Sequence, residues 1–289
     1  VPGTATYANL MDRRSEQLDT LSSVMGIRVS YDGENRATVH TDGGQTLVKA
    51  GYVNELSYDR GTGILTAGDM DITPGTAGRR GSEAGSLAGN IKMVAKIVPQ
   101  SDLELDEIAR ALIEGFEDTD ASLTPGQPGL FTDNGAALSA TYPAGLAGRI
   151  KVNTAADPYQ GGDLTLLRDG LGAVTVGAES DNTQVLAWLA MFDTKVAFDP
   201  AAGQGALKSI SDFTNGVFSA QHARRVEADS SLSSLSASTE TYRANRLNAK
   251  GVNIDTELQD LQLIEQAYNA NSQALRVASE MIDTLLAMT

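Results

Sequence analysis

The sequence contains no cysteine among its 289 residues. Disulfide bonds, thiolate metal sites and cysteine nucleophiles are therefore excluded. Aromatic residues make up 5% of the chain, with a single tryptophan, which argues against a large aromatic core or a platform for stacking carbohydrate rings. Long apolar runs are also missing, because no stretch approaches the roughly 18 residues of a membrane span. Residues 1–3 show neither the basic region nor the apolar core of a secretion signal.

Basic residues are outnumbered by acidic ones. The chain carries 22 Lys and Arg against 37 Asp and Glu, which gives a net charge of -15 at pH 7. Such a charge repels phosphate backbones and anionic lipid headgroups, so neither nucleic acid nor a membrane surface is expected as a partner. The apolar content of 41% is typical of folded protein, and the length allows one large domain or two modest ones.

Residues that could carry chemistry are sparse. The two histidines, His40 and His222, are far apart in the sequence, and no other ligands accompany them to form a metal site. Asp69 and Asp71 lack the spacing and final glutamate of a calcium-binding loop, which favours a polar turn. Neither a nucleophile elbow nor a phosphate-binding loop occurs. The sequence therefore predicts no catalytic, cofactor-binding or metal-binding residue, and we expect no enzyme.

Residues 1–118 show three patterns. Residues 4–25 place apolar side chains at helical spacing opposite charged ones, which predicts an amphipathic helix. Short β-favouring runs separated by Asp-Gly turns fill residues 27–71 and predict antiparallel hairpins. Helical spacing returns over residues 82–118, where Pro99 is expected to break or kink the helix.

The middle of the chain is less regular. Residues 119–180 are rich in Gly, Pro, Asp and Thr, and we expect loops with short strand or helical pieces. From Thr183 to Phe198 the spacing again predicts a helix. Its apolar side is expected to hold Val185, Leu186, Leu189, Phe192 and Val196, with Trp188 nearby.

The end of the chain has the clearest organisation. Residues 207–249 and 254–288 contain no proline and almost no glycine, which predicts two long helices. Residues 250–253 separate them, and Gly251 suits the left-handed cap that ends a helix. We therefore expect an antiparallel helical hairpin.

The final predicted helix carries a heptad pattern. Apolar residues recur every seven positions at Ile254, Leu261, Tyr268, Leu275 and Ile282, and a neighbouring register holds Ile264, Ala278 and Leu285. A stripe sustained over five repeats predicts a coiled-coil seam. The preceding helix has a narrower and weaker stripe, which consists of Ala228, Leu232, Leu235 and Tyr242.

The carboxy-terminal residues resemble the terminal helix of flagellar axial proteins. The resemblance rests on GVNIDTEL at residues 251–258, QAYNANS at residues 266–272 and EMIDTLL at residues 280–286. Rod, hook and hook-associated proteins share this pattern, so the tail alone indicates the superfamily.

Other matches resemble the hook-associated protein 1 family in particular. They are LMDRR at residues 10–14, GIRVS at residues 26–30, GSLAG at residues 85–89, VPQ at residues 98–100 and LDEIA at residues 105–109. The family's long amino-terminal helix has no counterpart before the first residue. We therefore expect a fragment that covers the carboxy-terminal half or more of the family's length.

The resemblance implies a structural subunit that is secreted unfolded by the flagellar type III apparatus. Outside the cell it would form a short zone between the hook and the filament. The implied partners are copies of the chain, the hook protein, a neighbouring hook-associated protein and an export chaperone that binds the carboxy-terminal helix. We expect the assembly interface to consist of Ile254, Leu258, Leu261, Tyr268, Leu275, Ile282 and Leu285.

Several alternatives stay open at this stage. The seam residues can pack on the helix at residues 207–249 of the same chain, on neighbouring subunits, or on both. The chain can also be a hook or rod subunit. A third alternative is a secreted cell-wall hydrolase with an axial tail, which would need a cleft with paired carboxylates.

Together these patterns predict an α+β protein. A helical-arm domain with irregular loops is expected at residues 1–26 and 81–206, and a small antiparallel β-hairpin domain is inserted at residues 27–80. Long coiled-coil-like helices at residues 207–289 form the predicted helical hairpin, which would be the assembly segment.

Overall fold

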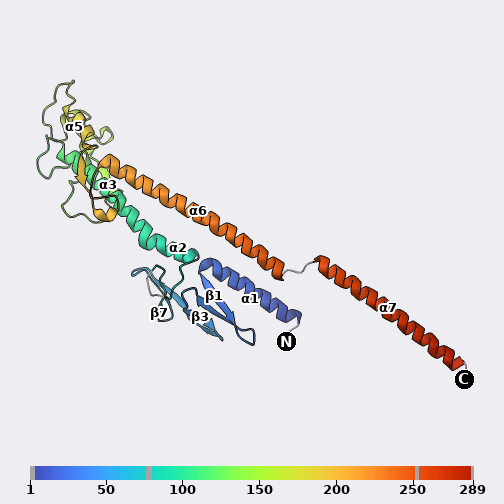
Figure 1. The fold of residues 1–289 in the computed structure, drawn as a ribbon. Coiled ribbons are helices and arrows are strands. Elements are labelled where there is room, and N and C mark those ends of the chain that lie inside the picture. Colours follow the sequence, from blue (N-terminus) through green and yellow to red (C-terminus); the bar gives the residue numbers. More distant parts are fainter. Residues whose placement is uncertain (1–3, 76–79, 251–253, 288–289) are drawn as a thin grey trace. The chain divides into compact units, whose positions relative to one another are not determined.

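The computed structural model describes residues 4–75, 80–250 and 254–287. The chain divides into two compact units, Val1–Phe218 and Ser219–Thr289, which Figure 1 colours from blue to red along the sequence. Long helices and several small antiparallel sheets make up the described residues, so the predicted α+β class is confirmed.

The first unit begins with helix α1, Ala5–Val24. Thr4 caps the helix, because its side chain accepts a hydrogen bond from the backbone N–H of Tyr7. Arg14 attaches α1 to the following strands: its guanidinium lies over the Tyr31 ring at 4.5 Å and donates to the backbone carbonyl of Asn35. The predicted helix is confirmed, and Leu18 and Leu21 of its apolar side pack on the core, whereas Leu10 is 54% exposed.

Seven short strands follow in two antiparallel sheets. The first sheet has the order β1-β2-β3-β4 and the second β5-β6-β7, which confirms the predicted hairpins. The strands are β1 (Ile27–Tyr31), β2 (Ala37–Thr41), β3 (Thr46–Lys49), β4 (Tyr52–Val53), β5 (Leu56–Asp59), β6 (Ile64–Ala67) and β7 (Met70–Asp71).

The hairpins share their core with helices. Val39 and Leu65 from the two sheets are buried together with Met25, which follows α1, and with Ile91 of helix α2 (Ser86–Lys92). Gly26 lies directly against Asp42 and Ser82, and an added Cβ atom would come within 2.6 Å of the Asp42 carboxylate. The hairpin segment is therefore packed against the helices on both sides of it in sequence.

Helix α2 continues through one π-helical segment, Met93–Ile97, into helix α3, Val98–Asp118. Pro99, which was expected to break or kink the helix, occupies the first turn of α3. The ring of a proline inside a helix clashes with the carbonyl four residues earlier, and the wider π turn removes that clash. The predicted interrupted arm is confirmed, with the interruption located just before the proline.

A second core surrounds α3. Phe116 of α3 contacts the rings of Phe131 and Trp188 at 5.0 and 5.2 Å between centroids. Helix α6 (Ile210–Lys250) contributes Phe213, which is completely buried. Its ring stacks on that of Phe198, with 3.9 Å between the centroids. Because these rings come from five separate segments, they hold the irregular middle of the chain around α3.

The prediction for residues 183–198 is wrong in two respects. Helix α5 ends at Met191, and Lys195–Ala197 form strand β10, which pairs with β11 (Leu207–Ser209). The buried side chains of α5 are Trp188 and Met191, whereas three residues of the expected apolar side are at least 40% exposed: Val185, Leu186 and Leu189. Beyond the end of the helix, the hydroxyl of Thr194 donates to the carbonyl of Ala190, which lies in the last turn of α5.

The helix predicted from residue 207 begins at Ile210, because residues 207–209 pair with β10. Residues between α3 and α5 form the expected short pieces. They are β8 (Phe131–Asp133), β9 (Ile150–Val152), the 3-10 helices Leu146–Gly148, Thr154–Ala156 and Pro158–Gln160, and α4 (Leu166–Asp169). A further 3-10 helix, Pro200–Ala202, follows β10.

Buried carboxylates of α3 hold these loops. Asp106 accepts hydrogen bonds from the N–H groups of Gly145 and Ala147 at 2.6 and 2.8 Å. These groups lie at the start of a 3-10 helix, where backbone N–H groups lack helical partners. The aspartate therefore caps a turn that lies far from it in the sequence.

Glu107 is the centre of a second polar group. It accepts two hydrogen bonds from Arg110 at 3.0 and 2.9 Å, one from the Tyr142 hydroxyl at 3.3 Å and one from the N–H of Asp199 at 2.8 Å. Arg110 also pairs with Glu114 and donates to the carbonyl of Ala197. This network joins α3 to two distant loops.

The second unit consists of α6 from Ser219 onward and α7, Ile254–Ala287. Both predicted long helices are confirmed. The predicted turn at residues 250–253 lies largely outside the described residues, so the antiparallel packing of the two helices stays a prediction.

We predict that Glu107→Gln destabilises the first unit by about 3 kcal/mol at pH 7, because Arg110 then loses the buried one of its two charged partners and keeps only the half-exposed Glu114. Burial tends to raise the pKa of Glu107, but hydrogen bonds from Arg110 and Asp199 and the charge of Arg110 bring it below its usual value of 4.5. A lowered pKa contributes stability above pH 4.5 that is lost as the pH falls through the folded-state value. The difference between the proteins should therefore shrink in acid.

Urea unfolding followed by the fluorescence of Trp188 measures this effect, because the single tryptophan is buried in the same unit. Glu34→Gln is the matched control, since Glu34 pairs with Arg36 on the surface and should change stability little. An equal effect of both substitutions, or a difference that grows in acid, would contradict the role given to Glu107.

Candidate assembly surface

The predicted seam lies on α7. Its residues contain no glycine or proline, and they are mostly good helix formers, so a continuous helix is expected from propensity alone. A seven-residue spacing returns close to the same direction after two turns of a helix. The structure therefore places the seam residues along one side of α7.

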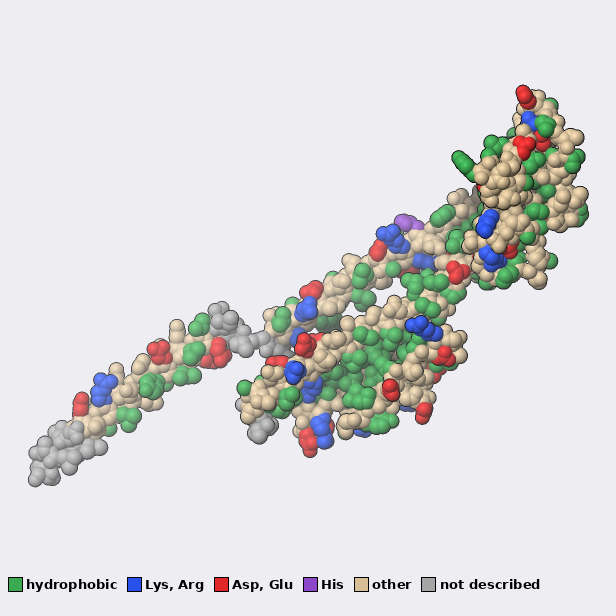
Figure 2. Space-filling model, turned by 180° about the vertical axis from the view of Figure 1, so that it is seen from behind, with side chains coloured by type: hydrophobic (Ala, Val, Ile, Leu, Met, Phe, Trp, Pro, Cys, Tyr) green, Lys and Arg blue, Asp and Glu red, His purple; other side chains and the backbone are tan. Residues whose placement is uncertain are grey.

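The described seam residues are exposed. Leu258, Leu261, Tyr268 and Leu275 have exposed fractions of 51%, 58%, 72% and 73%. Figure 2 shows hydrophobic side chains gathered along one edge of α7 and most charged ones along the other. Ile254, Ile282 and Leu285 belong to the same helix, but their side chains lie outside the described part.

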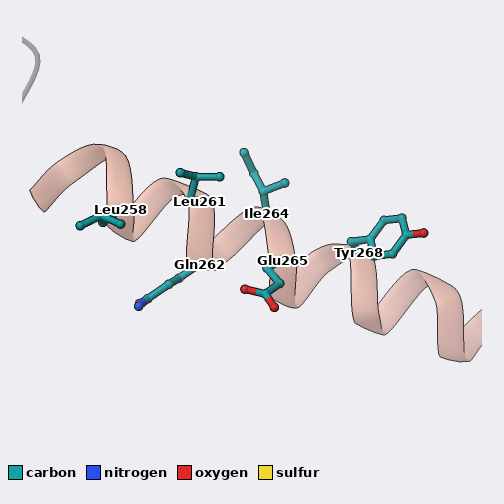
Figure 3. A pocket seen from close by; sticks show the side chains of 6 residues that line it. All are labelled: Leu258, Leu261, Gln262, Ile264, Glu265 and Tyr268. Atoms are coloured by element: carbon teal, nitrogen blue, oxygen red, sulfur yellow. The ribbon is translucent and has the colours of Figure 1, made fainter. Parts of the chain in front are cut away.

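A shallow hollow marks the amino-terminal half of the seam. It is lined by Leu258, Leu261, Ile264 and Tyr268 together with the polar Gln262 and Glu265. Figure 3 shows Leu261, Ile264 and Tyr268 on one side of the helix, with Gln262 and Glu265 pointing to the other side. Because a single helix provides every lining residue, a second helix would have to complete the surface.

Exposure of this size is costly for a folded chain. Complete burial of a leucine side chain stabilises a protein by about 1.5–3 kcal/mol relative to exposure. A contiguous row of such side chains is typical of protein interaction surfaces. The row of apolar side chains can therefore pack against a helix with matching spacing.

The weaker stripe on α6 is exposed as well. Leu232, Leu235 and Tyr242 have exposed fractions of 65%, 67% and 75%. The hydroxyls of Ser238 and Thr239 donate to helix carbonyls four residues earlier, as such side chains commonly do within helices. These hydroxyls are therefore engaged by α6 itself.

The isolated polar residues considered in the sequence form ordinary local contacts. The His40 ring nitrogen lies 3.1 Å from the Thr46 hydroxyl, and His222 is an exposed residue of α6. Asp71 accepts hydrogen bonds from the N–H and hydroxyl of Thr73, which confirms the expected polar turn. Among the described residues, no three His, Cys, Asp or Glu side chains form a group that could hold a metal ion.

Within the described ranges, no helix is long and apolar enough to cross a membrane. The buried carboxylates Asp106 and Glu107 were not singled out from the sequence. The spacing of Glu107 and Arg110, one helical turn apart, was the available signal for an ion pair.

Two family models match the chain. The helical domain of the flagellar hook-associated protein FlgK matches residues 1–127, which contain α1, the hairpins, α2 and α3. The carboxy-terminal segment of the flagellar basal body rod FlgEFG proteins matches residues 243–288, which contain α7 and its seam. The chain thus combines two segments that are characteristic of flagellar proteins.

A curated relative gives the particular resemblance. The flagellar hook-associated protein 1 of Bacillus subtilis (strain 168) is 23% identical over 307 residues, an alignment that covers 96% of this chain and 58% of the relative. The resemblance to the hook-associated protein 1 family is therefore confirmed. The chain spans a little more than half the length of that relative.

We predict that Leu275→Asp changes the free energy of unfolding of the first unit by less than about 0.5 kcal/mol, because the side chain is exposed on α7. Phe213→Ala should instead cost about 3–5 kcal/mol, because the ring is completely buried and its loss leaves a cavity. Trp188 fluorescence reports the first unit, and circular dichroism reports the long helices. Strong destabilisation by Leu275→Asp would show that the chain covers its own seam.

Proposed function

We propose that this chain is a structural subunit of the bacterial flagellum, located outside the cell at the junction between hook and filament. The observation that carries the proposal is the exposed heptad seam on α7, in the segment similar to the rod proteins. The first unit, similar to the FlgK helical domain, favours the hook-associated class over a hook or rod subunit.

The subunit assembles through the seam formed by Ile254, Leu258, Leu261, Tyr268, Leu275, Ile282 and Leu285. Its partners are copies of itself, the hook protein and a neighbouring hook-associated protein. Because the hook and the filament differ mechanically, a subunit between them has to contact both kinds of neighbour. The first unit and the long helices of the second provide separate surfaces for these contacts.

Export precedes assembly in this proposal. The chain leaves the cell unfolded through the type III apparatus, and the lack of cysteine suits passage of an extended chain because no disulfide can form on the way. A chaperone binds the α7 segment before export. The reason is physical, since a chain that exposes Leu261, Tyr268 and Leu275 is prone to premature association.

A structural role also agrees with the contacts of the buried carboxylates. A glycoside hydrolase uses two carboxyl groups that face a substrate cleft. Asp106 and Glu107 are instead bound by backbone N–H groups and by Arg110. These contacts hold loops in place, so they support the structural proposal over the hydrolase alternative.

We predict that the double substitution Leu261→Asp with Leu275→Asp abolishes incorporation of the subunit at the hook–filament junction. Each change places a charge in the seam, where burial without a partner is strongly unfavourable. Flagella isolated from cells that produce the variant are examined by immunogold electron microscopy with an antibody to the chain, and motility is recorded in parallel.

The matched control is Gln259→Asp with Gln273→Asp, which adds the same charge to the opposite side of α7 and should incorporate normally. Normal incorporation of the seam variant would refute the seam assignment. Loss of incorporation in both variants would indicate that negative charge anywhere on α7 is harmful, and the seam would lose its special role.

A further inference from the structure

The hydrophobic contacts of the first unit fall into two parts that share no residue. The core of the hairpins and α2 lies within residues 18–91, and the packing around α3 lies within residues 103–217. We call the described residues up to Lys92 the hairpin lobe and residues 98–218 the loop lobe. The chain passes from one lobe to the other once, through the segment Met93–Ile97.

Polar contacts follow the same division. In the hairpin lobe, the Ser82 hydroxyl accepts a hydrogen bond from the N–H of Gly26 at 2.6 Å. In the loop lobe, Asp106 and Glu107 accept hydrogen bonds from backbone N–H groups of distant loops. Each lobe is therefore stabilised by contacts of its own, which a rotation of one lobe relative to the other would leave intact.

The segment that joins the lobes is π-helical. The N–H of Val98 donates to the carbonyl of Met93, five residues earlier, and this is the bond that defines a π-helix. Pro99 follows directly and has no N–H, so it donates no bond to the preceding turn. Sharp bends in helices occur at prolines and at π turns, and here the two features are adjacent.

The π segment has no support from the side. It is described throughout, and none of its side chains is buried. Met93 and Val94 have exposed fractions of 48% and 62%, and the segment belongs to neither core. A part of the backbone with few buried contacts and exposed hydrogen bonds opens at a low cost in free energy. The least supported turn of this long helix thus lies where the lobes join.

We propose that Met93–Ile97, together with Pro99, is a hinge about which the hairpin lobe turns relative to the loop lobe. The bending is confined to the one turn that neither core holds, so both lobes keep their internal contacts as the angle between them changes. Water can replace each backbone hydrogen bond that opens, because the segment is exposed. The hinge goes beyond the proposed role in the flagellum and does not depend on it.

Deletion of a single residue can remove the hinge. A π-helix is closed by bonds between residues five apart and an α-helix by bonds between residues four apart. Deleting Ala95, whose side chain is exposed, therefore restores the α-helical pattern and leaves α2 and α3 in nearly the same rotational setting. Pro99→Ala accompanies the deletion, because a proline would clash inside the restored helix. The matched control is Pro99→Ala alone, which keeps the extra residue and with it the π turn.

Distances between nitroxide labels measure the motion, because the chain has no cysteine of its own. Both variants are labelled at Gln17→Cys on α1 and at Ala190→Cys on α5, two exposed positions in different lobes. Pulsed electron paramagnetic resonance on the purified chain gives the distribution of distances. A second pair, Gln17→Cys with Ser57→Cys, lies within the hairpin lobe and reports any motion inside that lobe.

We expect the distribution between the lobes to be at least twofold narrower in the deletion variant than in Pro99→Ala alone, with nearly the same mean distance. The distribution within the hairpin lobe should be narrow in both variants. Equal widths between the lobes overturn the proposal. A distribution within the hairpin lobe that is as wide as that between the lobes overturns it as well, because the motion then lies outside the π segment.

Hydrogen exchange of the unaltered chain tests the hinge without any substitution. We expect the amides of residues 93–98 to exchange at least tenfold faster than those of residues 105–115 in α3, because only the latter are held by a core. Equal protection along the whole helix overturns the proposal, whether or not the deletion variant folds.

Discussion

A single helix cannot cover its own apolar seam, so the seam on α7 stays exposed unless a second helix packs against it. Burial of Leu261, Tyr268 and Leu275 is the main free energy that α7 can gain, and a helix gains it only from a partner with matching spacing. In the proposed assembly, the second unit therefore gains its largest stabilising contribution only when a partner binds. A long amphipathic helix is suited to this because its backbone hydrogen bonds are complete without a partner.

The first unit shows the opposite arrangement. Its cores close within the unit, where Met25 is covered by two sheets and a helix, and Phe116 by rings from distant segments. Irregular loops contribute few backbone hydrogen bonds of their own, and Asp106 and Glu107 provide fixed acceptors for them. The proposed position between unlike neighbours needs a part whose shape is independent of them.

Periodic patterns account for what could be predicted from the sequence. The seven-residue spacing of Leu261, Tyr268 and Leu275 and the Asp-Gly turns between hairpins are local signals, and both elements appear as expected. Helix α5 was predicted too long because Val196 continues a helical spacing, whereas pairing with β11 makes it part of a strand. The buried role of Asp106 was missed because its partners, Gly145 and Ala147, are distant in the sequence.

The same distinction between local and long-range signals applies to the seam and the choice of its partner. A heptad pattern specifies that a side of α7 is apolar, but apolar contact is non-directional and does not choose among helices. Selection has to come from features that differ between candidate partners, which are side-chain size at each height and charge beside the row. Beside the seam of α7 lie the acidic residues Asp260 and Glu265, so charge can discriminate between partners. In the proposed assembly, specificity therefore comes from the charged residues beside the seam, and affinity comes from its large apolar residues.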